Sequence, residues 1–338
     1  MANSKIALRG VTKIFGPRPD EVLAQLQAGA SKDDLQADTG HVIGLNNVDL
    51  NVAEGELHVV MGLSGSGKST LIRHVNRLID PTAGTIEVNG RDVLQMDMDE
   101  LRQFRRTEIA MVFQKFGLLP HRSVIDNVAY GLEIRGVEKT ERLKTAEEWI
   151  AKVGLEGYEA SRPHQLSGGQ QQRVGLARAL AMDVDILLMD EAFSALDPLI
   201  RSGMQDELLA LQKDLNKTIL FITHDFDEAL KIGDQVTVLQ DGAVIQSGRP
   251  EEVVLNPANP HVEEFVADVN RARAIHVQTI MEVGDFERCA SAVEVGACCE
   301  DVLPLFAEHD WVGVNAEDGK QIGRLTVKQV IKALARHS

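Results

Sequence analysis

The sequence predicts an α/β fold with a buried, largely parallel sheet in one large domain, followed by a smaller α/β domain. The 338 residues suit that division. Short apolar runs have the composition of strands that are buried on both faces. These runs are LHVVMG (57–62), DILLMD (185–190), TILFITH (218–224) and QVTVLQDG (235–242). The segments between them are long enough for crossover helices, which parallel strands require.

An antiparallel β subdomain is predicted at the start of the chain. Residues 4–15 and 42–52 alternate in polarity as strands do. Residues 17–41 carry apolar residues at helical spacing between Pro and Gly, which indicates a helical insertion between the two strands.

A helical subdomain is predicted over about 115–182, where the pattern becomes mostly helical. The segment 249–269 contains three prolines and then a helical stretch. We therefore place the boundary of the first domain near 270, with 1–270 as the larger domain. Residues 271–338 form the small module, in which strands at SAVEV, WVGVNA and DGKQIGRLT are combined with a helix through CCEDVLPLFAEH and a closing helix.

The overall charge argues against a nucleic-acid partner. Asp and Glu number 51 against 35 Lys and Arg, a formal net charge of -16, so the surface repels a phosphate backbone. The N-terminus has no long apolar stretch, and no segment reaches the roughly 18 apolar residues of a membrane span. Any role at a membrane is therefore expected to come through a partner.

A phosphate-binding loop is predicted at GLSGSGKS (62–69). It follows the pattern G-x-x-x-x-G-K-[ST] and lies between a predicted strand and a predicted helix, a context that a plain Gly/Ser-rich turn does not need. Glycines let backbone N–H groups face phosphate oxygens, and the helix N-terminus adds a positive end. Lys68 is expected at the terminal phosphates and Ser69 at Mg²⁺. The predicted nucleotide-binding residues here are Gly62, Ser64, Gly65, Ser66, Gly67, Lys68, Ser69 and Thr70.

Two carboxylates follow the apolar strand ILLMD. Asp190 and Glu191 are expected at the carboxyl edge of the sheet, where the phosphate loop also lies. Asp190 suits the metal and Glu191 suits an attacking water. Taken alone, a DE pair after a strand is usually a solvated loop start, so this prediction depends on the phosphate loop.

A second anion-binding helix start is predicted at LSGGQ (166–170). Gly168 and Gly169 precede a long helix, whose N-terminus favours negative charge. An ordinary helix cap would explain SGG alone, but not these five residues in this order and place.

These motifs together resemble the ATP-binding cassette (ABC) ATPases over about residues 5–245. The matching segments, in the order of that family, are GLSGSGKS, Gln114 in VFQKFGLLPH, LSGGQ, ILLMDE, SALD (194–197) and His224 in ITHD. The resemblance implies a P-loop NTPase fold that binds ATP and Mg²⁺. It also implies that Phe15 stacks on adenine, although a strand Phe is more often a core residue.

The chain is similar, more closely still, to the ATPases of glycine betaine/proline importers, including the 17–41 insertion. That subfamily often ends in paired cystathionine-β-synthase (CBS)-type modules, whereas the tail here has room for about one. A regulatory module and a structural or dimerising tail are both open readings.

The resemblance implies a role for each site residue. Lys68, Ser69, Gln114 and Asp190 serve phosphate and Mg²⁺, Glu191 polarises water, and His224 contacts the γ-phosphate, with Glu191, His224 and Gln114 as the catalytic set. Ser167, Gly168, Gly169 and Gln170 act on the ATP of the opposite subunit, and Asp197 joins the two sites.

The resemblance also implies partners and a cargo. We expect a head-to-tail homodimer at the cytoplasmic face of the inner membrane, bound to transmembrane permease subunits through residues around 115–135. A separate extracytoplasmic protein would bind the solute. The expected function is ATP-driven import of a small osmolyte such as glycine betaine, proline betaine, choline or trimethylamine N-oxide.

Two other functions fit the sequence less well. A soluble cassette ATPase of DNA repair or translation predicts long coiled coils, two fused cassettes or a basic surface, and the sequence has none of these. A nucleotide-responsive regulatory protein built on the tail does not explain a full set of hydrolytic motifs.

Overall fold

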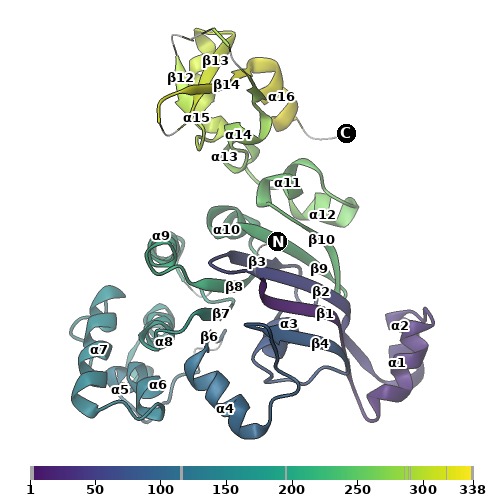
Figure 1. Ribbon diagram of the computed structural model, residues 1–338, viewed down its shortest axis with the longest axis vertical. Coiled ribbons are helices and arrows are strands. Elements are labelled where there is room, and N and C mark those ends of the chain that lie inside the picture. Colours follow the sequence, from purple (N-terminus) through teal and green to yellow (C-terminus); the bar gives the residue numbers. More distant parts are fainter. Residues whose placement is uncertain are drawn as a thin grey trace. The chain divides into compact units, whose positions relative to one another are not determined.

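The computed structural model describes residues 4–114, 117–194, 196–284, 286–287, 289, 291–316 and 318–335. The chain divides into two compact units, residues 1–225 with 232–245 and residues 226–231 with 246–338 (Figure 1). The second unit takes in the segment 246–270, and within it Arg271 donates a hydrogen bond of 3.1 Å to the carbonyl oxygen of Val254. The functional boundary near 270 stays a prediction.

The predicted antiparallel pairing at the N-terminus is confirmed. β1 (Ser4–Phe15) pairs antiparallel with β2 (Val42–Ala53) and, on its other side, with β4 (Ala83–Val88). A short β5 (Arg91–Asp92) completes a sheet of order β2-β1-β4-β5.

The insertion between β1 and β2 is helical, as predicted. It forms α1 (Pro19–Gln27) and α2 (Lys32–Thr39), which lie beside the C-terminal end of β1 and the N-terminal end of β2 (Figure 1). Its apolar residues pack against the strand ends in a small cluster of their own, which consists of Ile14, Val22, Leu26, Leu35 and Ile43.

The predicted parallel sheet is also confirmed. Six strands lie in the order β10-β9-β3-β8-β7-β6. β3 pairs in parallel with β8 and β9, and β7 pairs in parallel with β6 and β8. The bounds are β3 Leu57–Met61, β6 Ile109–Val112, β7 Ile186–Asp190, β8 Thr218–Thr223, β9 Gln235–Gln240 and β10 Ala243–Gly248. This topology brings the carboxyl ends of β3, β7 and β8 to one edge, where the candidate site lies.

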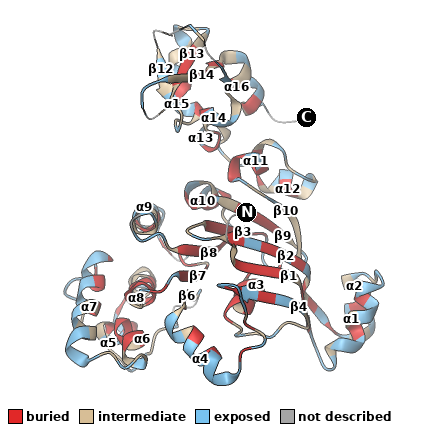
Figure 2. Ribbon diagram, viewed as in Figure 1, coloured by how far each residue is buried: buried red, intermediate tan, exposed pale blue. Residues whose placement is uncertain are grey.

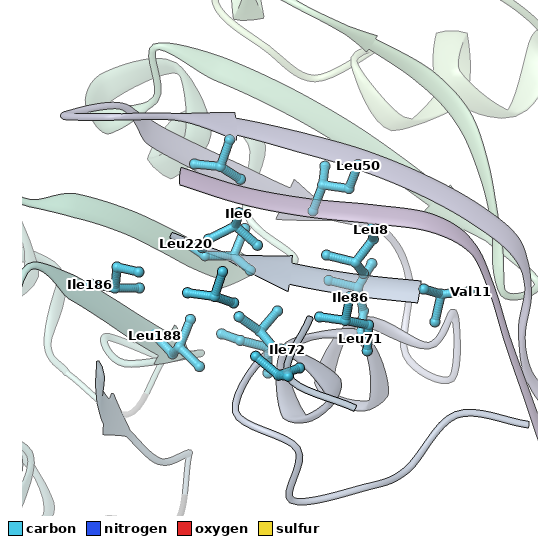
Figure 3. Packing of buried hydrophobic residues seen from close by; sticks show 14 of the residues in the cluster. Ile6, Leu8, Val11, Leu50, Leu71, Ile72, Ile86, Ile186, Leu188 and Leu220 are labelled. Carbon is cyan, nitrogen blue, oxygen red and sulfur yellow. The ribbon is translucent and has the colours of Figure 1, made fainter. Parts of the chain in front are cut away.

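One core joins the two sheets of the first unit. Leu71 and Ile72 of α3 (Lys68–Val75) lie between Leu8 and Ile86 of the antiparallel sheet and Leu188 of the parallel sheet (Figure 3). Burial of such a side chain contributes about 1.5–3 kcal/mol. The core therefore holds α3, and the loop before it, rigidly against both sheets; the strands are accordingly mostly buried in Figure 2.

The region after β6 is mainly helical, in line with the predicted subdomain. The helices of the rest of this unit are α4 Met98–Thr107, α5 Val124–Val128, α6 Tyr130–Ile134, α7 Lys139–Lys152, α8 Gly168–Ala181 and α9 Pro198–Leu215, with a 3₁₀ turn at Pro163–Gln165. α5, α6 and α7 pack around α8 (Figure 1). Within the described part of the chain, no helix combines the length and apolar character that a membrane crossing requires.

The second unit contains a small four-stranded sheet of order β11-β14-β13-β12. Its strands are β11 Glu282–Val283, β12 Ala292–Glu294, β13 Trp311–Asn315 and β14 Gln321–Thr326. Its helices are α10 Phe226–Ile232, α11 Pro250–Leu255, α12 Pro260–Phe265, α13 Arg271–Ala274, α14 Val277–Ile280, α15 Cys299–Val302 and α16 Val327–Leu334, with a 3₁₀ helix at Leu303–Ala307.

Two helix predictions in this unit need correction. The helix expected through CCEDVLPLFAEH stops at Val302 and continues as a 3₁₀ helix, because Pro304 cannot donate the backbone hydrogen bond of an α-helix. The stretch 249–269 holds two helices where we expected one, since Pro250 and Pro260 each start a helix in its first turn.

Candidate nucleotide-binding site

The loop between β3 and α3 needs its glycines. Gly62 has φ 150° and Gly67 has φ 102°, both in the region that favours glycine. A Cβ on Gly62 would lie 2.2 Å from the carbonyl oxygen of Leu239, and one on Gly67 would lie 2.5 Å from that of Gly44. The loop therefore turns tightly against its neighbours, directly before the N-terminus of α3.

Lys68 is buried at the start of α3. Its ammonium donates hydrogen bonds to the carbonyl oxygens of Gly62 at 2.7 Å and Leu63 at 2.9 Å, inside the turn of the loop. Burial lowers the pKa of Lys68, and the charges of Glu191 and Asp190 oppose that shift. The loop thus presents one cation close to two carboxylates.

Asp190 ends β7 and is fully buried. Its carboxylate accepts hydrogen bonds from Ser69 Oγ at 2.8 Å and from an Arg73 nitrogen at 3.3 Å. The parallel pairing of the strands brings this carboxylate to the hydroxyl of the phosphate loop, although the two residues are far apart in sequence. A carboxylate and a hydroxyl are hard oxygen ligands of the kind that Mg²⁺ prefers.

Glu191 follows in the left-handed backbone region, with φ 48°. A non-glycine residue in this conformation is uncommon and turns the side chain away from the strand direction. Its carboxylate accepts a hydrogen bond of 2.7 Å from Gln114 Nε2 and lies 3.7 Å from His224 Nδ1. Three residues from three segments therefore meet at the carboxyl edge of the sheet.

A cavity of about 300 Å³ lies along these residues. Phe15 is 39% exposed and lines the cavity, so its ring does not belong to the core. The other described residues of its wall are Lys32, Val42, Ile43, Gly44, Ser64, Gly65, Gly67, Lys68, Ser69, Thr70, Gln114 and Glu191. The cavity thus has an aromatic and aliphatic end and an end lined with backbone amides and a lysine, which suits a base joined to phosphates.

The open backbone of the loop supports a phosphate ligand. Two of its predicted residues, Gly62 and Ser66, are not among the described residues that line the cavity, and Ser66 Oγ is buried without a hydrogen-bond partner among the described residues. A Cβ on Gly65 would meet nothing within 4 Å, so the backbone there faces open space. An open cradle of amides, a buried lysine and a Ser–Asp oxygen pair fit a magnesium nucleotide.

The second predicted anion site lies elsewhere. Ser167 caps α8: its hydroxyl accepts from the N–H of Gln170 at 3.3 Å, and its own N–H donates to Gln170 Oε1 at 2.9 Å. Gly168 and Gly169 form the first turn. None of these four residues is among the described residues that line the cavity. One chain therefore presents two separate helix starts.

Asp197 lies at the start of another helix. It caps α9 through the N–H of Leu199 at 3.1 Å. Leu199, two residues after Asp197, is 83% exposed, which is a large exposure for an apolar side chain. Ala195 of the SALD motif lies outside the described residues, as do Lys115 and Phe116 after Gln114.

Some residues at the site were not predicted. Lys32 and Gly44 line the cavity, and Arg73 contacts Asp190. Arg73 follows Ser69 by one helical turn, so the i, i+4 spacing places both on the same face of α3 and could have predicted it. No such spacing relates Lys32 to the site motifs. Its position at the cavity depends on how the insertion packs in the folded chain.

Comparison with known proteins supports the nucleotide site. The chain matches the ABC transporter family over residues 45–194. It is 54% identical over 278 residues to the glycine betaine transport ATP-binding protein OpuAA of Bacillus subtilis (strain 168), a match that covers 82% of this chain and 66% of that protein. The chain thus spans just under two thirds of this relative.

Other relatives are matched over more of their length. The chain is 47% identical over 340 residues to the trimethylamine N-oxide transport system ATP-binding protein TmoW of Ruegeria pomeroyi (strain ATCC 700808 / DSM 15171 / DSS-3), covering 100% of this chain and 99% of that one. Among solved structures, a dimeric post-hydrolysis state of the ATP-binding cassette MJ0796 bound to ADP and Pi is similar, with a TM-score of 0.63 and 34% identity. That match covers 72% of this chain and 98% of the other.

Proposed function

The chain belongs to the ATP-binding proteins of the ABC transporter family, and we propose that it hydrolyses ATP to drive the import of a small osmolyte through a partner permease. The observation that carries the proposal is the meeting of Lys68, Ser69, Asp190 and Glu191 at one edge of the sheet. ATP is the substrate, and its phosphates are assigned to the loop 62–69.

Hydrolysis at this site depends on positioning and charge neutralisation. Lys68 neutralises the terminal phosphates, and Ser69 with Asp190 would hold Mg²⁺, which supplies further charge neutralisation when bound. Glu191 accepts a proton from the attacking water as that water approaches the γ-phosphate. Gln114 orients Glu191 through their 2.7 Å hydrogen bond, and His224, near the same carboxylate, donates to the γ-phosphate.

A second copy of the chain completes the site in this proposal. Ser167, Gly168 and Gly169 form an anion-binding helix start away from the cavity of their own chain, so they are assigned to the ATP of the partner copy. Asp197 and the exposed Leu199 are assigned to the contact between copies. The similar MJ0796 cassette is itself dimeric with ADP and Pi bound, which supports this arrangement.

The permease is assigned to a groove beside the helical region. This cavity of about 360 Å³ is lined mainly by apolar side chains, among them Phe113, Leu119, Tyr130 and Ile134. Phe113, which lines this cavity, directly precedes Gln114 in the chain, so movement of a bound permease segment can reach Glu191 through the hydrogen bond from Gln114. With this partner the protein acts at the cytoplasmic face of the inner membrane, and an extracytoplasmic protein delivers the solute.

The cargo is proposed to be a methylated amine such as glycine betaine, proline betaine, choline or trimethylamine N-oxide. The names of the relatives include glycine betaine and trimethylamine N-oxide, and the relative named for the latter matches over the whole chain. Proteoliposomes holding this chain, its permease and its binding protein should take up labelled betaine or trimethylamine N-oxide when ATP is enclosed. Uptake of a sugar or a peptide, with the methylated amines ignored, would contradict the proposal.

The residues after 270 are proposed to form a single CBS-like module that modulates transport without taking part in hydrolysis. Its sheet and α16 lie in the second unit, whereas the described residues that line the nucleotide cavity all lie in the first unit. A chain ending near 270 should therefore keep its ATP affinity and its basal hydrolysis. Its rate of transport in the complete importer should change. If this shortened chain is folded and binds ATP but hydrolyses none, the module is part of the catalytic machinery.

A further inference from the structure

Lys32 brings a second cation to the nucleotide cavity. It is the first residue of α2, and its half-buried side chain lines the cavity together with Phe15 and Gly44. The next two residues, Asp33 and Asp34, are exposed. Lys32 and Lys68 are the two cationic residues among the described lining residues, so each bears directly on an anionic ligand.

The present partner of Lys32 lies next to the phosphate loop. Its ammonium is 3.4 Å from Asp241 Oδ1. Gly242, the next residue, donates its N–H to the carbonyl oxygen of Ser66 at 3.0 Å, so Asp241 lies against the loop that would bind phosphate. The Lys32 ammonium is therefore held at the edge of the phosphate end of the cavity.

Stability does not account for this lysine. A cation in the first turn of a helix opposes the helix dipole, which is unfavourable. The ion pair with Asp241 is long, and the Asp241 side chain is 73% exposed, so the pair adds little stability. Ser31 already caps α2 by accepting the N–H of Asp34 at 3.1 Å. A ligand in the cavity explains the position of Lys32 better than the fold does.

The insertion is anchored firmly enough to place Lys32. Leu35, one turn along α2, packs in the cluster with Ile14 and Ile43, which adjoin Phe15 and Gly44 of the cavity wall. His41 fixes the other end through a 2.7 Å contact between its Nε2 and the carbonyl oxygen of Pro17. Leu35, close to Lys32 on α2, is thus tied to the strands that form the cavity, and the two ends of the insertion are tied to each other.

We propose that Lys32 is a nucleotide-binding residue, whose ammonium leaves Asp241 and binds a phosphate oxygen of the ATP held by the loop 62–69. The 17–41 insertion is then part of the nucleotide site and not a separate appendage. This inference rests on the proposed ATP site and adds a ligand to it.

Calorimetric titration of the full chain with ATP, ADP and adenosine tests the inference. Lys32→Ala should weaken binding of ATP and ADP by about 3- to 10-fold, the range for one charge-assisted contact at a partly exposed position, and leave adenosine binding unchanged. Lys32→Arg should recover most of the affinity because the charge returns. Asp241→Asn should tighten ATP binding, since it removes the competing carboxylate, and Asn tolerates the left-handed φ of 51° at this position.

Lys217→Ala is the matched control. Lys217 pairs with Asp183 at 2.8 Å and is not among the described lining residues, so the same change of charge should leave ATP binding as in the wild type. Unchanged ATP affinity in Lys32→Ala, or an equal loss for adenosine, overturns the inference. If wild-type protein does not bind ATP at all, the proposed function itself fails, and the two failures are distinguishable.

Discussion

Lys68→Ala should abolish most of the ATP affinity of the chain. The substitution removes a buried cation that is held inside the phosphate loop by the carbonyl oxygens of Gly62 and Leu63. A hydrogen bond to a charged group contributes about 1.5–3 kcal/mol, which corresponds to a loss of roughly 10- to 150-fold in affinity. Titration with a fluorescent ATP analogue measures the loss directly.

The control for this variant is a test that it still folds. Leu71 and Ile72 anchor α3 in the core independently of Lys68, so the thermal unfolding of Lys68→Ala should remain cooperative and near that of the wild type. Lys68→Arg should retain intermediate affinity, because its charge stays but its bulk differs. Wild-type affinity in a folded Lys68→Ala protein would remove the loop 62–69 from the site.

Glu191→Gln should separate hydrolysis from binding. The amide keeps the shape of the side chain and can still accept the hydrogen bond of Gln114, but it cannot take a proton from water. Loss of a general base lowers turnover by about 10²- to 10⁴-fold, while ATP binding should stay within about threefold of the wild type. Steady-state phosphate release and nucleotide titration measure the two quantities.

A carboxylate away from the site provides the comparison. Glu54 is paired with Lys5 at 3.2 Å, and its side chain is 54% exposed. Glu54→Gln removes the same charge without touching the cavity, and its turnover should match that of the wild type. If Glu191→Gln hydrolyses ATP at the wild-type rate, Glu191 has no role in the chemistry.

The parts of the fold that could be predicted depend on local patterns. β3, the phosphate loop and α3 follow from an apolar run, a glycine spacing and helical periodicity that lie within 19 consecutive residues, 57–75. β10 was missed because its side chains are mostly half-buried and carry no strong alternation. The break in the helix after Val302 follows from Pro304 and could have been predicted.

The site was predictable as a set of motifs but not as a geometry. The sequence motifs indicate Asp190 and Ser69, whereas their 2.8 Å contact depends on the parallel pairing of β3, β8 and β7. Lys32 depends on how an insertion folds back over the strand ends, which no local pattern encodes. The capping at Ser167 could be predicted from the local sequence. The position of this helix start outside the described cavity lining could not, because it depends on the tertiary fold.

In the proposed mechanism, two copies of the chain share each ATP. Light scattering on Glu191→Gln protein measures whether they do, because this variant keeps bound ATP from being hydrolysed. The mass should rise from 37.0 kDa to twice that value with Mg-ATP, but not with ADP. Adding Gly169→Asp, which places a carboxylate at the second anion site, should keep the mass at 37.0 kDa. A protein that binds ATP and remains monomeric at all concentrations would contradict the shared site.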